Sequence, residues 1–157
     1  MSVELHSARA NDAPAIQALI AANVEAGHLL PRTLSDVTAH AGRFLVVEER
    51  GRVIACGELA PLSRDVAEIR SLVVDEVSRG HGLGDAIVRG LRERAEREAV
   101  RTLCVFAHQP AYFCRLGFSI VPHAWLPEKI ALDCSTCSLF RTCGQSALII
   151  SLRPRPS

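Results

Sequence analysis

The sequence lacks the features that mark a membrane-embedded, secreted or polyelectrolyte-binding protein. No apolar run approaches the roughly 18 residues needed to cross a bilayer, and residues 1–6 carry neither the positive charge nor the apolar stretch of a signal peptide. The 18 Lys+Arg nearly balance the 17 Asp+Glu, so the net charge is only +1 and no segment is strongly basic. We therefore expect a cytoplasmic protein that binds neither nucleic acid nor a membrane.

Internal repeats and low-complexity segments are also absent. The 157 residues are 48% hydrophobic and 22% charged, which is typical of a globular domain rather than of a disordered chain. This length fits one domain and leaves little room for two. We expect a single domain over residues 1–152, which includes a cysteine-containing insertion at 122–146, and a tail at 153–157.

The spacing of apolar residues predicts alternating helices and strands. Asn11 and Asp12 are suited to cap a helix that ends at Gly27. Further helices are expected at 34–40, 82–98 and 110–116. Strands are expected at 3–9, 44–48, 53–59, 67–75, 102–107, 118–121 and 147–152. Because the early strands form a hairpin and the strand–helix–strand order from 67 to 107 is a parallel crossover, the prediction is an α/β fold with a mixed sheet.

The most informative segment is a glycine loop, Arg79–Gly84, between a buried apolar strand and the most clearly amphipathic helix. Glycines at alternate positions let the backbone fold tightly and let a ligand approach the amides. Together with the positive end of the helix dipole, those amides form an anion site suited to a pyrophosphate. The glycine spacing differs from the dinucleotide fingerprint, and the P-loop ending is missing. The alternative interpretation is a turn that only caps the helix.

Arg79-x-x-Gly82-x-Gly84 is similar to the Arg/Gln-x-x-Gly-x-Gly/Ala signature of the GNAT superfamily of N-acetyltransferases. Residues 68–75 resemble that family's fourth strand, residues 111–118 resemble its late Gly-Phe segment, and the order of elements matches over about residues 3–152. The resemblance implies the GNAT fold, a mixed twisted sheet of about six to seven strands with helices on both faces. It also implies acetyl-CoA as co-substrate, bound at Leu72, Val73, Val74, Arg79, Gly80, His81, Gly82, Leu83 and Gly84.

Acetyl transfer to an amine needs a group that takes the amine's proton and a group that assists the departing thiolate. In several GNAT enzymes a Glu-Ile at this place on the fourth strand supplies the base, which makes Glu68 the candidate. The alternative for Glu68 is a solvated carboxylate at the start of a strand. The family's usual acid is a tyrosine at the position where this chain has Phe113. Because Tyr112 lies one residue early, the tyrosine's role is not transferred to it. Either no side-chain acid is used, or another group such as Cys114 or His108 lies near the sulfur.

An aromatic-Phe pair in place of the tyrosine resembles the short, single-domain bacterial N-acetylglutamate synthases. Residues 30–34, 42–48 and 125–130 are also similar to segments of that group. The resemblance implies transfer of acetyl to the α-amine of an amino acid, L-glutamate first, as the opening step of arginine biosynthesis. Arginine suits carboxylates because it binds them through two parallel hydrogen bonds. The implied substrate contacts are Arg32, Arg70 and Ser146. The family's arginine two residues before that serine is here Gly144.

Three cysteines near the C-terminus, Cys134, Cys137 and Cys143, are spaced partly like metal ligands. A structural zinc site takes four ligands, and only three thiols are clustered here. We therefore favour no metal and read the three as small residues that pack a loop over the sheet. A zinc site or a redox pair is the alternative. Cys56 and Cys104 lie in apolar strands and are expected to be unreactive core residues.

Other acceptors and another class of function stay open from the sequence. The acceptor is alternatively another amino acid, a polyamine or a protein N-terminus, although near-neutral charge and two candidate arginines favour a small anionic molecule. The missing tyrosine leaves a non-catalytic sensor that binds acetyl-CoA as a further alternative. We expect direct transfer in a ternary complex, since Cys114 has no evident base partner. A homodimer is expected by analogy with other GNAT proteins.

Overall fold

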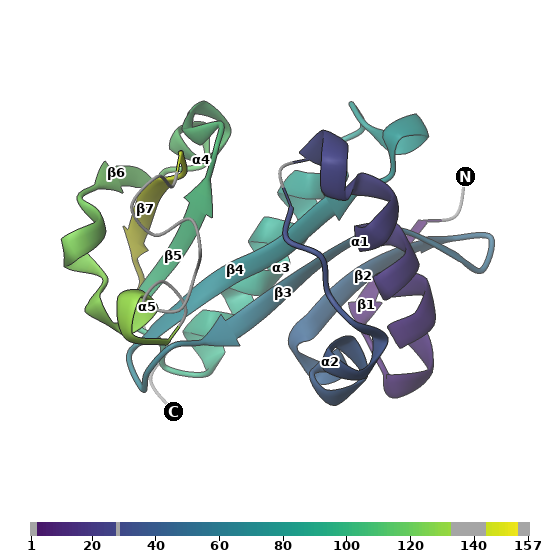
Figure 1. The fold of residues 1–157 in the computed structure, drawn as a ribbon, viewed down its shortest axis with the longest axis horizontal. Helices are drawn as coiled ribbons and strands as arrows, with labels where there is room; N and C mark the ends of the chain where they lie inside the picture. Colours follow the sequence, from purple (N-terminus) through teal and green to yellow (C-terminus); the bar gives the residue numbers. More distant parts are fainter. Residues whose placement is uncertain (1–2, 28, 133–143, 154–157) are drawn as a thin grey trace. The chain divides into compact units, whose positions relative to one another are not determined.

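The computed structural model describes residues 3–27, 29–132 and 144–153. Within them, seven strands form a mixed sheet in the order β1-β2-β3-β4-β5-β7-β6 (Figure 1). The strands are β1 (Val3–Ser7), β2 (Phe44–Glu49), β3 (Arg52–Pro61), β4 (Val66–Val74), β5 (Thr102–Ala107), β6 (Ser119–Val121) and β7 (Ser146–Ser151). The α-helices are α1 (Ala13–Gly27), α2 (Leu34–Ala39), α3 (Leu83–Arg97), α4 (Pro110–Arg115) and α5 (Pro127–Leu132). Short 3-10 helices are η1 (Ala10–Asp12), η2 (Ala41–Arg43), η3 (Glu76–Ser78) and η4 (His123–Trp125).

The chain divides into two compact units. The first consists of residues 1–59 and 70–93, and the second consists of residues 60–69 and 94–157. β3, β4 and α3 contribute residues to both units. No helix in the described ranges is long and apolar enough to span a bilayer.

The strands of the first unit begin with an antiparallel meander. β1 pairs with β2, and β2 pairs with β3. Arg50 and Gly51 connect β2 to β3, and both have positive φ, 53° and 76°. Two consecutive residues of this kind make the tight hairpin turn whose twist matches the flanking strands. The predicted hairpin with a glycine in its turn is therefore confirmed.

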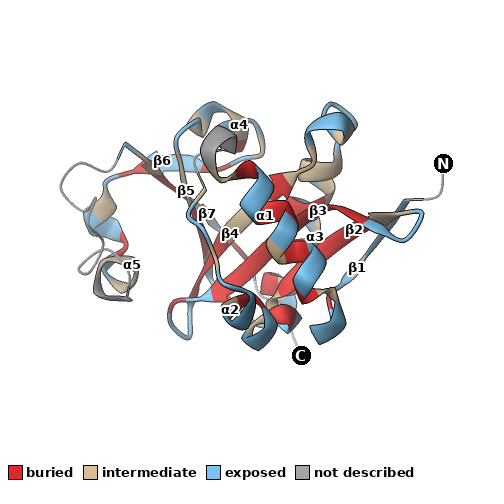
Figure 2. Cartoon of the chain, turned by 45° about the vertical axis from the view of Figure 1, so that its right-hand side comes forward, coloured by how far each residue is buried: buried red, intermediate tan, exposed pale blue. Residues whose placement is uncertain are grey.

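Helices cover both faces of the strands in the first unit (Figures 1 and 2). On one face, Ile16 and Ile20 of α1 share a core cluster with Phe44, Val46 and Cys56, and all five are fully buried. The apolar residues of α1 recur at helical spacing because they form the side of the helix that is buried against these strands.

The opposite face of the same strands packs closely against α3. A Cβ added to Gly57 of β3 would lie 2.6 Å from Ile87 Cγ2, and one added to Gly90 of α3 would lie 2.6 Å from Leu45 Cδ1. A glycine on each element therefore leaves room for the Ile87 and Leu45 side chains, which would have to shift for any residue with a Cβ. Ile87 and Leu91 of α3 are fully buried, as the amphipathic pattern predicted.

The start of α1 differs from the prediction. Asn11 and Asp12 do not cap it: they lie in η1, and α1 begins only at Ala13. The Asp12 carboxylate instead accepts a hydrogen bond from the Arg9 amide at 2.8 Å. The carboxylate thus satisfies a free amide at the beginning of the 3-10 turn, one turn earlier than expected.

The parallel strand pair of the crossover lies in the second unit. Val66–Ile69 of β4 pair in parallel with Thr102–Val105 of β5, which confirms that prediction. β7 lies antiparallel between β5 and β6. The insertion predicted at 122–146 did not include α5, which begins at Pro127, a favourable first helical residue. Cys134, Cys137 and Cys143 lie outside the described residues.

Candidate active site

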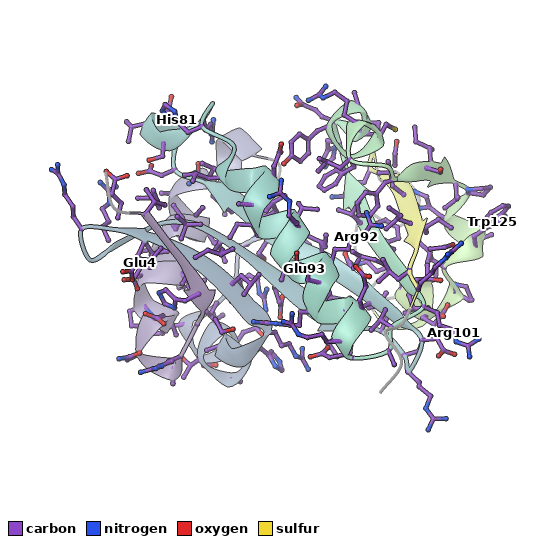
Figure 3. The ribbon with its side chains drawn as sticks, turned by 180° about the vertical axis from the view of Figure 1, so that it is seen from behind. Glu4, His81, Arg92, Glu93, Arg101 and Trp125 are labelled. Carbon is purple, nitrogen blue, oxygen red and sulfur yellow. The ribbon has the colours of Figure 1, made fainter. Side chains whose placement is uncertain are left out.

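The glycine loop Arg79–Gly84 leads from η3 into the first turn of α3. Gly80 and Gly82 have φ of 85° and 76°, a region that residues with a Cβ rarely adopt. A Cβ at either position would meet nothing within 4 Å, so the backbone there faces open space. His81 is exposed at this end of α3 (Figure 3). The first amides of a helix have no acceptor within it, so the loop has the geometry of an anion site.

The strand before the loop contributes one buried and two partly exposed residues. Val73 is 4% exposed and belongs to the core cluster of the first unit, whereas Leu72 and Val74 are partly exposed. The Val74 carbonyl accepts a hydrogen bond from Arg79 Nε at 3.2 Å. Arg79 Nη2 donates to Asn23 Oδ1 at 3.1 Å. The Arg79 side chain therefore links β4 and α1.

Arg32, predicted to bind a substrate carboxylate, is held by two carboxylates of the chain itself. Its Nε donates to Asp36 Oδ2 and its Nη1 donates to Glu58 Oε1, both at 2.6 Å. The pKa of Arg32 is raised overall. Burial by itself would lower this pKa, but the hydrogen bonds to Glu58 and Asp36 and the charges of these carboxylates outweigh the effect of burial. The hydrogen bond from Arg32 likewise lowers the pKa of Asp36. Of the guanidinium nitrogens, Nη2 is the one that bonds to no other described residue.

Glu58 was not anticipated, and it is the most deeply buried charged residue among those described, at 0% exposure. Its Oε2 has no hydrogen-bond partner in the described part of the chain, although Arg43 Nη1 lies 3.9 Å away. Because an uncompensated buried charge is strongly unfavourable, the two arginines are what allow a carboxylate here. No spacing signal in the sequence connects Glu58 of β3 with Arg32, 26 residues earlier.

Ser71 of β4 adopts φ of 51°, unusual for a non-glycine residue in a strand. Its hydroxyl accepts a hydrogen bond from Arg32 Nη1 at 3.1 Å, and its carbonyl accepts one from Cys56 Sγ at 3.5 Å. Burial raises the pKa of Cys56 to about 12. Cys56 is fully buried, as is Cys104, which confirms that both are core residues.

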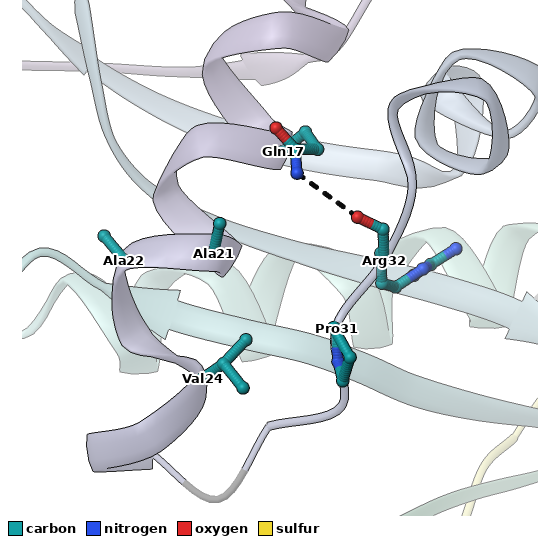
Figure 4. A pocket seen from close by; sticks show the side chains of 6 residues that line it. All are labelled: Gln17, Ala21, Ala22, Val24, Pro31 and Arg32. Atoms are coloured by element: carbon teal, nitrogen blue, oxygen red, sulfur yellow. Dashed lines mark hydrogen bonds between the residues drawn. The ribbon is translucent and has the colours of Figure 1, made fainter.

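A pocket of about 360 Å³ lies in the first unit between α1 and the segment that precedes α2 (Figure 4). Gln17 Nε2, in the lining of the pocket, donates to the Arg32 carbonyl at 3.3 Å. The Arg32 side chain extends away from Ala21 and Val24 (Figure 4). The volume falls in the range that holds small molecules. The lining residues are Gln17, Ala21, Ala22, Val24, Pro31 and Arg32.

Glu68, the predicted base, lies in the second unit and is 4% exposed. Its two carboxylate oxygens accept hydrogen bonds from Lys129 Nζ at 3.0 and 3.2 Å. Lys129 Nζ also lies 5.2 Å from the centre of the Phe106 ring. The alternative of a solvated carboxylate is therefore wrong. Lys129 was not predicted as a site residue because α5, which carries it, was not predicted.

The two other predicted acceptor contacts, Arg70 and Ser146, are more exposed than Glu68, whereas Phe113 at the family's tyrosine position is buried. Arg70 of β4 is half-buried, and its charge contributes to lowering the pKa of Asp36. Ser146 is half-buried at the start of β7, opposite Ala107 of β5. Phe113 is 7% exposed and packs edge-to-face on Phe118 with ring centres 5.6 Å apart. Phe113 is thus a core residue.

The sequence profile of the acetyltransferase (GNAT) family matches residues 13–118. The chain belongs to this family. Among its relatives, an uncharacterised N-acetyltransferase of Chlorobaculum tepidum is 30% identical over 94% of the chain and 96% of its own length. An amino-acid acetyltransferase of Mycobacterium tuberculosis is 35% identical over 71% of the chain and 66% of its own length. One from Azotobacter vinelandii is 30% identical, but the match spans only 26% of that protein.

Solved structures agree with the GNAT assignment. A Mycobacterium tuberculosis protein in complex with CoA and NLQ superposes with a TM-score of 0.80 at 27% identity, over 95% of this chain and 99% of that one. N-acetylglutamate synthase from Neisseria gonorrhoeae, complexed with coenzyme A and N-acetyl-glutamate, has the same fold, with a TM-score of 0.85 at 22% identity. The superposition covers 98% of this chain and 36% of the synthase chain.

Acetyl-CoA is the co-substrate of this GNAT chain. The glycine loop is suited to the phosphates of this molecule, because it combines glycines with positive φ, open space around them and the N-terminus of a 15-residue helix. Acetyl-CoA supplies an activated acetyl thioester. The predicted GNAT fold is confirmed, including a mixed sheet at the upper end of the expected six to seven strands.

Proposed function

We propose that this N-acetyltransferase acetylates the α-amine of an amino acid, with L-glutamate as the first candidate. The observation that carries the proposal is the 35% identity to an amino-acid acetyltransferase over 116 residues. With glutamate as acceptor, the reaction would be the opening step of arginine biosynthesis. We assign the loop Arg79–Gly84 to the pyrophosphate and the β4 backbone at Leu72, Val73 and Val74 to the pantetheine arm.

In this proposal Glu68 takes a proton from the acceptor's ammonium group, directly or through water. An amine becomes nucleophilic only after it loses that proton. The Lys129 ammonium lies 3.0 Å from a Glu68 carboxylate oxygen and forms an ion pair with it. Lys129 also orients the carboxylate by contacting both of its oxygens.

Arg32, Arg70 and Ser146 are the proposed contacts to the acceptor. Arg32 would use Nη2, because its Nε and Nη1 already bind Asp36 and Glu58. Those two carboxylates offset much of the arginine's attraction for an anion. This observation favours a second acceptor class, amino acids with an uncharged side chain.

The decisive experiment measures thiol release from acetyl-CoA with the twenty amino acids and one polyamine as acceptors. A rate of thiol release with glutamate well above the rates with the other acceptors supports glutamate as the acceptor. An uncharged amino acid as best acceptor supports the second class and removes glutamate. Turnover only with the polyamine rejects an amino-acid acceptor, and binding of acetyl-CoA without any turnover favours a sensor.

Replacing Gly82 with valine is expected to raise the Kd for CoA by about tenfold or more. A Cβ costs about 1–2 kcal/mol in the left-handed conformation and would enter the open space that we assign to the pyrophosphate. Titration calorimetry with CoA measures the change. Gly51→Val is the matched control, because Gly51 has the same φ of 76° and open surroundings but lies in the β2–β3 turn. Equal CoA affinity in the two variants would refute our placement of the pyrophosphate.

Replacing Cys114 with alanine is expected to leave kcat within about twofold of the wild type. Direct transfer uses no acetylated enzyme, and Cys114 is an exposed thiol. Steady-state kinetics with the best acceptor, together with mass spectrometry after incubation with acetyl-CoA alone, tests this. Loss of activity with an intact fold, together with a stable acetyl adduct on Cys114 of the wild type, would contradict direct transfer.

A further inference from the structure

The Arg79 side chain connects three segments of the first unit. It begins in the glycine loop, donates through Nε to the carbonyl of Val74 at the end of β4, and donates through Nη2 to Asn23 of α1. Hydrogen bonds from a guanidinium are charge-assisted and stronger than neutral ones. Arg79 therefore restrains the loop from the side of α1 as well as from the strand.

The Asn23 side chain is buried and oriented so that its oxygen accepts the hydrogen bond from Arg79. It is 7% exposed, and its Nδ2 donates to the Leu19 carbonyl, one helical turn earlier, at 2.8 Å. That bond orients the amide and leaves Oδ1 as the acceptor for Arg79 Nη2 at 3.1 Å. Asparagine is a poor residue for a helix interior, where alanine is favoured. Helix stability thus gives no reason for a buried asparagine at this position.

We propose that Asn23 is a positioning residue for acetyl-CoA, which holds the glycine loop through Arg79 in the conformation that receives the pyrophosphate. The inference rests on the proposed assignment of the loop to the pyrophosphate. Gly80 and Gly82 can visit many backbone conformations, and every alternative conformation lowers the fraction of protein ready to bind. Because Asn23 of α1 holds Arg79, a larger fraction of the protein keeps the loop conformation that binds, and Asn23 does this without contacting the ligand.

The test compares two probes, CoA and pantetheine, which lacks the pyrophosphate. Asn23→Ala is expected to raise the Kd for CoA about tenfold to a hundredfold, as for a lost hydrogen bond to a charged group. Its affinity for pantetheine is expected to change less than about twofold. Asn23→Asp keeps an oxygen for Arg79 but loses the donor to the Leu19 carbonyl, and it is expected to retain more CoA affinity than Asn23→Ala. In the Arg79→Ala background, Asn23→Ala is expected to have no further effect.

Thr38→Ala is the matched control for loss of a side-chain bond to a helix carbonyl. Thr38 Oγ1 donates to Leu34 O at 2.7 Å within α2 and is exposed. Unchanged CoA affinity in Asn23→Ala, or an equal loss for CoA and pantetheine, overturns the inference. If Gly82→Val lowers the affinity for CoA but Asn23→Ala does not, the assignment of the loop to the pyrophosphate is supported and the positioning role of Asn23 is rejected. If the wild type does not bind CoA, both the loop assignment and the role of Asn23 are rejected.

Discussion

Replacing Arg32 with alanine is expected to lower the free energy of unfolding by about 3–5 kcal/mol, the usual cost of removing one partner of a buried ion pair. The Glu58 carboxylate is 0% exposed, and Arg32 Nη1 is its hydrogen-bond donor. Without Arg32 the nearest cation is Arg43, at 3.9 Å from Oε2. Urea denaturation followed by circular dichroism measures the change.

Two further variants make this prediction specific. Arg52→Ala removes a guanidinium that is 70% exposed and paired with Asp75, and it is expected to cost at most about 1 kcal/mol. Adding Glu58→Gln to Arg32→Ala removes the uncompensated charge and is expected to recover part of the lost stability. If Arg32→Ala costs no more than Arg52→Ala, Glu58 does not depend on Arg32. In that case Arg32 is more available to a substrate than the structure indicates.

Replacing Glu68 with glutamine is expected to lower kcat by about a hundredfold to ten-thousandfold, the usual contribution of a positioned general base. The amide nearly matches the carboxylate in shape but cannot accept a proton from the acceptor's ammonium group. The Kd for CoA is expected to stay within about twofold, because Glu68 is not among the residues assigned to CoA. Steady-state kinetics and titration calorimetry on the same preparation separate the two quantities.

Asp65→Asn is the matched control for this variant. Asp65 lies directly before β4, and its side chain is 58% exposed in a long 3.8 Å contact with Arg101. Its substitution is expected to leave kcat unchanged. Lys129→Met is expected to lower kcat, as Glu68→Gln does, because the carboxylate loses the two hydrogen bonds that Lys129 donates to it. A kcat for Glu68→Gln within threefold of the wild type would remove Glu68 as the base.

Local patterns in the sequence were sufficient for most of the elements. The amphipathic stripe predicted α3 to within a residue of each end, and the hairpin followed from a glycine between two apolar runs. Both signals depend on residues a few positions apart, which one stretch of chain presents by itself. The start of α1 and the whole of α5 were missed, since short turns of helix have little periodicity of their own.

The sequence by itself determined the family, and it was enough to propose the glycine loop for acetyl-CoA and Glu68 as the candidate base. The tertiary structure decided what each charged residue is paired with. Glu58 meets Arg32 across 26 residues, Arg79 meets Asn23 across 56, and Glu68 meets Lys129 across 61. Spacing carries no signal for such pairs, because an ion pair or hydrogen bond needs only that folding bring two groups within about 3 Å. Burial then decides their importance, since the cost of an unpaired charge arises only after water is excluded.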